Sequence, residues 1–154
     1  MRKKIAGLPD AEYITPTKED LERRFKEYNE KYFDGMLPPC GITIKHNGFI
    51  GLYIGGGNIK KPRIYIRKDV YWTDETLKLI FIHEMVHHYV DMVIQPKHYV
   101  FPHGRTFNKS CDMLRKKHGL RVKLHELPQP YYYKEKIPTT YFGKLWRKYW
   151  GPRF

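Results

Sequence analysis

His83-Glu84-Met85-Val86-His87 is the stretch that decides how this chain is organised. Residues four apart on an α-helix lie one above the other, so the two histidines can reach one metal ion while Glu84 borders the same face. This H-E-x-x-H spacing is typical of a helix that binds zinc and supports hydrolysis, with the glutamate as general base. The pattern therefore predicts that His83 and His87 bind a metal ion and that Glu84 is catalytic.

A catalytic zinc ion usually has three protein ligands, so the sequence must supply one more. The metzincin pattern would place a glycine three residues and a histidine six residues after His87. Valine stands at both positions, which excludes that class. A glutamate ligand from a nearby helix is also excluded, because no glutamate follows Glu84 until Glu126.

The remaining downstream candidates for the third ligand are Asp91, His98, His103, Asp112 and His118. We choose His103 and keep His98 in reserve. Gly104 lets the backbone turn after His103, and the segment that follows is expected to form a helix anchored in the core by Phe107. The sequence thus predicts a metal site formed by His83, His87 and His103.

Three blocks of the chain carry a resemblance to a known family. They are residues 29–38 (N-E-K-Y-F-D-G-M-L-P), 83–87 (H-E-M-V-H) and 103–107 (H-G-R-T-F). In order and spacing they resemble the SprT-like metalloproteases, which include the Spartan-type DNA-dependent proteases, over roughly residues 17 to 120. The resemblance implies a zincin metalloprotease core and cleavage of DNA-bound or DNA-crosslinked proteins. The four-cysteine zinc ribbon that often follows this core does not occur in the sequence.

A plainer interpretation of the first motif is an amphipathic helix with surface histidines. The apolar neighbours of the motif indicate that this helix is buried; they are Leu77, Ile80, Phe81, Met85 and Val86. A buried polar cluster without a metal ion would lower the stability of the fold, because its polar groups would be unpaired. His88 should point away from the shared face, as a packed or surface histidine. Asp91 could orient a ligand imidazole, and a solvated or helix-pairing aspartate is the alternative.

The order of elements predicts an α+β fold, with a small antiparallel three-stranded sheet packed on helices. Strands are expected at residues 42–44, 49–54 and 63–66, and the glycine run 55–57 is expected to be a hairpin turn. Thr17 and Thr73 should cap two helices, the second running to about Ile94, and a third should follow Gly104 to about His118. By the resemblance, residues 63–66 would be an edge strand able to pair with a substrate chain, with a plain structural strand as the alternative.

Length and composition predict one compact core. The chain has 154 residues, of which 41% are hydrophobic, and we divide it into a metalloprotease domain at 1–127 and a basic, aromatic tail at 128–154. Cys40 and Cys111 form no C-x-x-C pair, so a redox motif or a cysteine zinc site is not indicated. We see no signal peptide and no long apolar run, and therefore expect a cytoplasmic protein without membrane contact, as a monomer.

Charge indicates a polyanionic partner. Lys and Arg number 29 against 16 acidic residues, a net charge of +13, which favours nucleic acid, including single-stranded DNA. In the tail, basic and aromatic residues alternate in a way that suits phosphate contact and base stacking; the candidates are Lys144, Trp146, Arg147, Lys148 and Trp150. The same aromatic residues could instead form a helix stripe docked on the protein's own core, and a membrane-surface helix is a less favoured third interpretation.

These features lead to one main hypothesis and two alternatives. The main one is a zinc-dependent metalloendopeptidase that acts on proteins bound or crosslinked to DNA, with Glu84 as general base. The alternatives are a nucleic-acid-binding module with a structural or inactive zinc site, and a zinc peptidase unrelated to DNA. Zinc is the expected cofactor, although manganese or cobalt can occupy similar sites.

Overall fold

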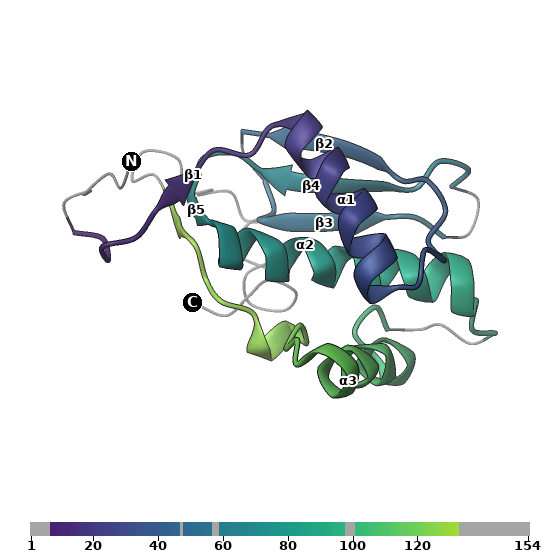
Figure 1. Cartoon of the computed structure of the whole chain (residues 1–154). Helices are drawn as coiled ribbons and strands as arrows, with labels where there is room; N and C mark the ends of the chain where they lie inside the picture. Colours follow the sequence, from purple (N-terminus) through teal and green to yellow (C-terminus); the bar gives the residue numbers. More distant parts are fainter. Residues whose placement is uncertain (1–6, 47, 57–58, 98–100, 133–154) are drawn as a thin grey trace.

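The computed structural model describes residues 7–46, 48–56, 59–97 and 101–132, and shows helices packed beside a small sheet (Figure 1). The expected α+β fold is confirmed. In chain order the elements are β1 (Tyr13–Ile14), α1 (Lys18–Tyr32), β2 (Gly41–Lys45), β3 (Gly51–Ile54), β4 (Arg63–Arg67), β5 (Val70–Thr73), α2 (Asp74–Tyr89), the π-helical turn η1 (Val90–Ile94), α3 (Arg105–His118), the 3₁₀ turn η2 (Leu124–Glu126) and β6 (Tyr131–Tyr132).

The main sheet has three strands in the order β2-β4-β3. β3 and β4 form the expected antiparallel hairpin, but β2 pairs with β4 in parallel, so the prediction of an antiparallel sheet is wrong for this pair. The cause is the segment between β2 and β3, which crosses the end of β4 instead of making a tight hairpin. Arg67 holds this segment, donating from its backbone N–H to Ile50 O and from its guanidinium group to Gly48 O, both at 3.0 Å.

β4 is the central strand of this sheet, so the expectation that residues 63–66 form an edge strand is also wrong. Ile64 and Ile66 are completely buried, as suits a strand with neighbours on both sides. Among the described residues, β2 and β3 form the edges of this sheet, and β3 is the one that lies along α2 (Figure 1). The strand that borders the helix of the H-E-x-x-H motif is therefore β3.

A second small sheet, in the order β1-β5-β6, was not predicted from the sequence. β1 and β6 have only two residues each, which is too short for an alternating pattern to show. Tyr132, near the start of the predicted tail, pairs with Val70. Trp72 in the middle strand is fully buried and donates its indole N–H to Arg67 O at 2.7 Å, which ties the two sheets together.

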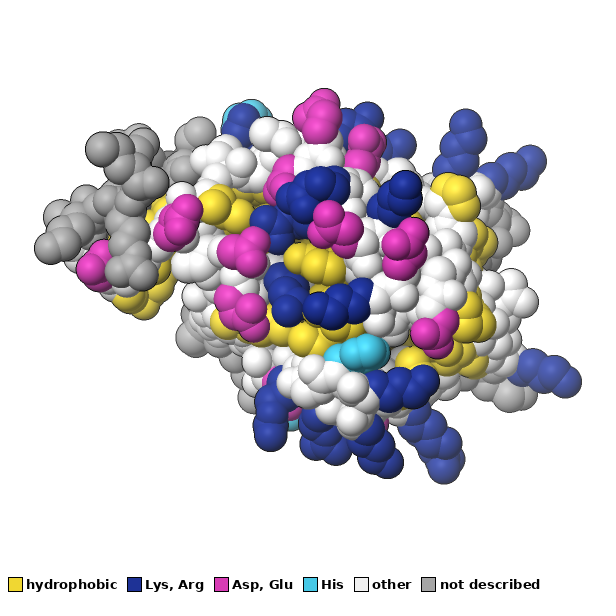
Figure 2. Space-filling model, in the orientation of Figure 1, with side chains coloured by type: hydrophobic (Ala, Val, Ile, Leu, Met, Phe, Trp, Pro, Cys, Tyr) yellow, Lys and Arg dark blue, Asp and Glu magenta, His cyan; other side chains and the backbone are white. Residues whose placement is uncertain are grey.

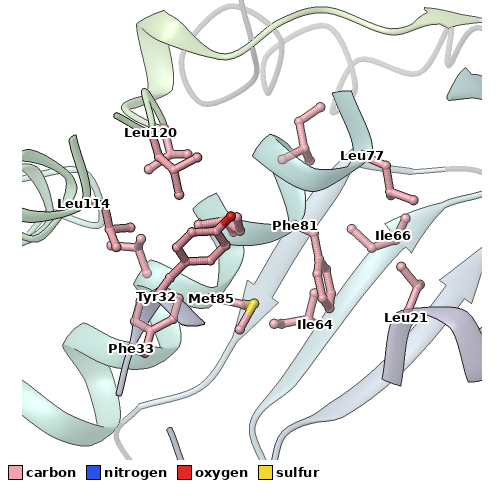
Figure 3. Close-up of a cluster of buried hydrophobic side chains, with 14 of the residues drawn as sticks. Leu21, Tyr32, Phe33, Ile64, Ile66, Leu77, Phe81, Met85, Leu114 and Leu120 are labelled. Atoms are coloured by element: carbon pink, nitrogen blue, oxygen red, sulfur yellow. The ribbon is translucent and has the colours of Figure 1, made fainter. Parts of the chain in front are cut away.

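The core lies between the main sheet and the helices. Leu21 of α1 and Phe81 and Met85 of α2 gather around Ile64 and Ile66 of β4 (Figure 3). On the other side, α2 packs against α3, and because it is covered on both sides few of its residues are exposed. Within the described part of the chain, no helix is both long and apolar enough to cross a membrane.

The predicted helix ends are confirmed. Thr17 and Thr73 cap α1 and α2, each accepting a hydrogen bond at 3.1 Å from the backbone N–H three residues later. After α2, the chain continues as the π-helical turn and leaves it at Gln95, which has a left-handed φ of 50°. The motif helix is thus fixed at both ends by local sequence.

The first block of the resemblance forms a tight clamp at the end of α1. Asn29 donates from its side-chain amide to Leu37 O at 3.1 Å, and its amide oxygen accepts from Leu37 N at 3.0 Å. Gly35, with φ of 70°, turns the chain between them and donates to Asn29 O at 2.9 Å. The clamp positions Pro38 next to the motif helix, where His88 Nε2 lies 2.8 Å from Pro38 O.

Replacing Asn29 with alanine is therefore expected to lower the free energy of unfolding by about 2 kcal/mol, because two hydrogen bonds worth about 1 kcal/mol each are lost. Urea denaturation measures this difference. Glu30→Ala, at the exposed neighbouring position, should change stability by less than about 0.5 kcal/mol. An unfolding midpoint for Asn29→Ala equal to that of Glu30→Ala would contradict the clamp.

Candidate metal centre

The side chains of the H-E-x-x-H motif lie in a buried environment. His83 is 2% exposed and Glu84 6% exposed, while His87 is partly buried. Burial follows from the position of α2 between the main sheet and α3. Because an isolated polar group is costly in such a place, each of these side chains needs a partner.

The start of α3 supplies the third imidazole. His103 Nε2 lies 3.1 Å from both His83 Nε2 and His87 Nε2, and one nitrogen from each of the three rings lies within 4.8 Å of the others. Zinc–nitrogen bonds of about 2.0–2.1 Å in a tetrahedron place ligand nitrogens about 3.3 Å apart. The two distances from His103 Nε2 are therefore close to the spacing that a shared metal ion requires.

The backbone fixes which nitrogen of His83 faces the other rings. His83 Nδ1 lies 2.7 Å from Val122 O, and a carbonyl oxygen can only accept, so Nδ1 carries the proton. In the neutral ring, Nε2 then has a free lone pair directed at His87 and His103. Such a hydrogen bond from the outer nitrogen is the usual way in which proteins orient a metal-binding histidine.

Burial also keeps the three rings uncharged. Desolvation lowers the pKa of His83 to about 3 and that of His103 to about 4, and it holds the pKa of His87 well below its ordinary value. A metal ion competes with protons for imidazole nitrogen, and only the neutral ring can bind it. At neutral pH all three histidines are in the form that binds a metal.

Phe107 packs against all three imidazoles. Its ring centroid lies 4.4 Å from that of His87, 4.9 Å from that of His83 and 5.0 Å from that of His103, and the side chain is fully buried. The prediction that Phe107 anchors in the core is confirmed. The H-G-x-x-F block therefore supplies both the third imidazole, from His103, and the aromatic ring of Phe107 that packs against all three imidazoles.

Gly104 lies in the tight turn that was expected, and its N–H donates to Phe101 O at 3.1 Å. It precedes α3 with φ of −80°, which other residues also adopt. A Cβ atom at this position would lie only 3.1 Å from Phe101 O, because the chain turns back closely there. Glycine is therefore favoured at position 104 because the backbone approaches Phe101 O closely there.

Glu84 lies between α2 and the edge strand β3. Burial raises its pKa to about 8, and a hydrogen bond from the backbone N–H of Tyr53 acts in the opposite direction, because it favours the carboxylate. The carboxyl group can thus hold a proton near neutral pH, as a group that takes up and returns a proton must. Tyr53 has no motif around it, and sequence reasoning did not select it.

Gly51 makes room for Glu84. A Cβ atom on Gly51 would lie 2.9 Å from Glu84 Oε1 and 3.0 Å from Ile80 Cγ2. A larger residue at this position would therefore require the Glu84 carboxyl group to shift and Ile80 or the strand to give way. An alternating strand pattern gives no sign of this requirement.

Gly51→Ala is accordingly expected to displace the Glu84 carboxyl group or the strand. The rate of any reaction that uses Glu84 should then fall by about tenfold to 100-fold, since displacements of about 1 Å have effects of that size. Gly48→Ala is the matched comparison for steric crowding, because a Cβ atom there meets nothing within 4 Å, although its φ of 97° adds local strain. Steady-state kinetics on both variants measures the difference. Wild-type rates for Gly51→Ala would show that the contact is easily relieved.

The other candidates for the third ligand lie away from the group or outside the described residues. Asp112 pairs with Lys123 at 2.9 Å, and His118 ends α3 with its ring edge-on to Tyr32. Asp91 accepts from the Tyr53 hydroxyl at 2.6 Å instead of from a ligand imidazole. His98, the reserve ligand, lies outside the described residues.

Two further predictions concern groups near the motif. His88 is fully buried and packed, as expected for a residue turned away from the shared face. The second is that the residue stabilising a developing oxyanion is one of Arg105, Tyr89, His98 and Tyr65. Tyr65 is paired with Leu52 on the sheet face opposite α2, and Tyr89 packs on Phe33. Arg105 remains exposed at the start of α3.

The tail residues proposed for nucleic-acid contact, Lys144, Trp146, Arg147, Lys148 and Trp150, lie outside the described residues, so their role stays a prediction. Within the described chain, His83, His87 and His103 form a group that can hold a metal ion. A model of the SprT-like family matches residues 21–126, a segment that contains all three sequence blocks.

This chain belongs to the SprT-like family. A comparison with curated proteins found no match. In this SprT-like protein the second and third blocks meet at one place: the second supplies His83, Glu84 and His87, and the third supplies His103. The first block contacts them indirectly, through the hydrogen bond between Pro38 O and His88.

Proposed function

We propose that this SprT-like protein is a zinc-dependent metalloendopeptidase. The observation that carries the proposal is the meeting of three neutral imidazoles with a buried glutamate beside them. Histidine nitrogen suits zinc, and three protein ligands leave the open position that distinguishes a catalytic zinc site from a structural one. When bound there, zinc would act as a Lewis acid that activates water and polarises a peptide carbonyl.

Glu84 would provide the acid–base chemistry. Its carboxylate takes a proton from the attacking water and returns it to the nitrogen of the leaving amine. Burial favours this exchange, since it raises the pKa of Glu84 towards the pH at which the enzyme would work. The Tyr53 N–H would hold the carboxylate in place, and His83, His87 and His103 would hold the metal ion.

We extend the proposal to substrates that are bound to DNA. The outer face of α3 is strongly basic, with Arg105, Lys109, Arg115, Lys116 and Lys117 all exposed. Figure 2 shows dark-blue side chains along the lower edge of the molecule, where α3 lies in Figure 1. Because α3 begins directly after His103, a nucleic acid on this face would bring its bound proteins near the site, and the net charge of +13 supports such a partner.

The proposed peptidase is tested with the purified protein and a DNA-binding protein as substrate, with and without single-stranded DNA. Cleavage that requires added zinc and stops with a chelator is the expected result, and DNA should accelerate it. Chelator-resistant cleavage would reject the metal mechanism. DNA binding without any cleavage would instead indicate a nucleic-acid-binding module, and cleavage that DNA does not change would indicate a peptidase unrelated to DNA.

The basic face has its own test. Lys109→Glu/Lys116→Glu should weaken DNA binding and reduce its dependence on salt, because fewer phosphate contacts release fewer counterions. The control Lys18→Glu/Lys26→Glu changes the same charge on exposed positions of α1. Equal loss of affinity in both variants would show that net charge matters and that α3 is not the binding face.

A further inference from the structure

Tyr53 is the residue at which the edge strand β3 meets the motif helix. Its backbone N–H donates to the Glu84 carboxylate, and its ring lies parallel to that of His87, with 2° between the planes and 6.3 Å between the centroids. One residue therefore contacts both the proposed general base and one of the proposed ligands.

The hydroxyl group of Tyr53 extends these contacts beyond the site. It donates to Asp91 Oδ2 at 2.6 Å, and its oxygen lies 3.0 Å from His88 Nδ1. Asp91 belongs to the π-helical turn directly after α2, and His88 continues to Pro38 O. The hydroxyl thus joins β3 to the turn that follows the motif helix through Asp91, and it packs beside His88, which bonds to the clamp formed by the first block.

The glycine run after β3 encloses this contact. A Cβ atom on Gly55 would lie 2.2 Å from the Tyr53 hydroxyl oxygen and 2.7 Å from Asp91 Oδ2, and one on Gly56 would lie 3.1 Å from Asp91 Oδ1. Gly56 also has φ of 81°. These glycines make the hairpin turn that was predicted, and in addition they allow the backbone to cover the Tyr53–Asp91 pair closely.

We propose that Tyr53 is the positioning residue of this site, holding the His87 ring and the Glu84 carboxyl group in register with β3. The inference rests on the proposed metal site. Within the part of the chain that the structure describes, β3 has a sheet partner on one side only, so its position relative to α2 depends on contacts such as these. Residues that support a metal ligand from outside typically alter metal affinity or activity by about 10-fold to 100-fold when they are removed.

Tyr53→Phe is the sharpest test, because it retains the ring and the backbone N–H and removes only the hydroxyl. Tyr65→Phe is the matched control: it removes a tyrosine hydroxyl from the neighbouring strand, on the opposite sheet face, where the ring lies beside Lys45 Nζ. The measurements are zinc affinity by competition with a coloured chelator, the absorption spectrum of the cobalt-substituted protein, thermal unfolding, and kcat and KM on a peptide substrate.

For Tyr53→Phe we expect unchanged zinc stoichiometry, zinc affinity about tenfold weaker, a shifted cobalt spectrum, and kcat about tenfold lower with little change in KM. Tyr65→Phe should match the wild type. Asp91→Ala removes the other partner of the Tyr53–Asp91 hydrogen bond. The double variant Tyr53→Phe/Asp91→Ala should lose no more zinc affinity than either single variant, because both substitutions break the same contact.

The proposal is overturned if Tyr53→Phe has wild-type zinc affinity and cobalt spectrum, whether or not it unfolds at a lower temperature. It is also overturned if Tyr65→Phe shows the same losses. Should Tyr53→Phe not fold, Asp91→Ala must show the weaker zinc affinity for the proposal to stand. Zinc affinity and the cobalt spectrum do not require catalysis, so a wild-type protein that binds zinc and cuts no peptide would reject the peptidase proposal without deciding the role of Tyr53.

Discussion

Glu84→Gln is expected to retain zinc and to lose peptide cleavage, with kcat lower by about 10²- to 10⁴-fold, the usual contribution of a general acid–base group. Glutamine has nearly the same shape as glutamic acid but cannot take a proton from water. The fold should tolerate the change well, because burial raises the pKa of Glu84 to about 8, so the environment of this side chain favours a neutral group. A neutral amide therefore adds no buried charge.

Metal analysis and steady-state kinetics on the same preparation check this expectation. Glu75→Gln, an exposed glutamate in the first turn of the same helix, serves as the control and should have wild-type kinetics. Loss of zinc from Glu84→Gln would instead mean that Glu84 binds the metal. Full activity in a zinc-loaded Glu84→Gln protein would remove Glu84 from the mechanism.

His103→Ala is expected to lose both zinc and activity, with metal affinity weaker by more than about 100-fold, since removal of supporting residues alone costs about 10-fold to 100-fold. Two imidazoles on one helix turn would remain, and they leave a zinc ion without its third protein ligand. The fold should persist, because the start of α3 is anchored by Phe107, which is fully buried. The protein should thus remain folded without its metal.

Zinc content after dialysis, thermal unfolding and peptide cleavage test this variant together. His125→Ala removes an exposed histidine from the 3₁₀ turn and should leave all three properties unchanged. A His103→Ala protein with one bound zinc and normal cleavage would reject the third ligand, and His98 would then be the next residue to replace.

Much of the site could be predicted from the sequence because its features are local. The spacing of His83 and His87 fixes their relation on one helix turn, and Thr73 fixes where that helix begins. His103 was found by the same kind of reasoning, since the following glycine and Phe107 marked a helix start. Each of these signals depends on residues within a few positions of one another, whose geometry the backbone dictates.

The sheet shows where such reasoning fails. The strand segments were found, but strand order and direction were not, because they depend on which segments meet in space. Arg67 holds the crossing segment between β2 and β3 and so makes β4 central, yet nothing near Arg67 in the sequence indicates that role. Tyr53 and Gly51 were missed for the same reason, as their partners lie on α2, more than 25 residues away along the chain.

By itself, then, the sequence determined the family, the three helices and the side chains that belong on one face of the motif helix. The tertiary structure alone decided that β3 borders the site and that Val122 O sets the proton on His83. It also decided that burial lowers the pKa of the histidines and raises that of Glu84. The physical reason is that helix periodicity and capping act over a few residues, whereas desolvation and strand pairing depend on distant segments that meet only in the folded chain.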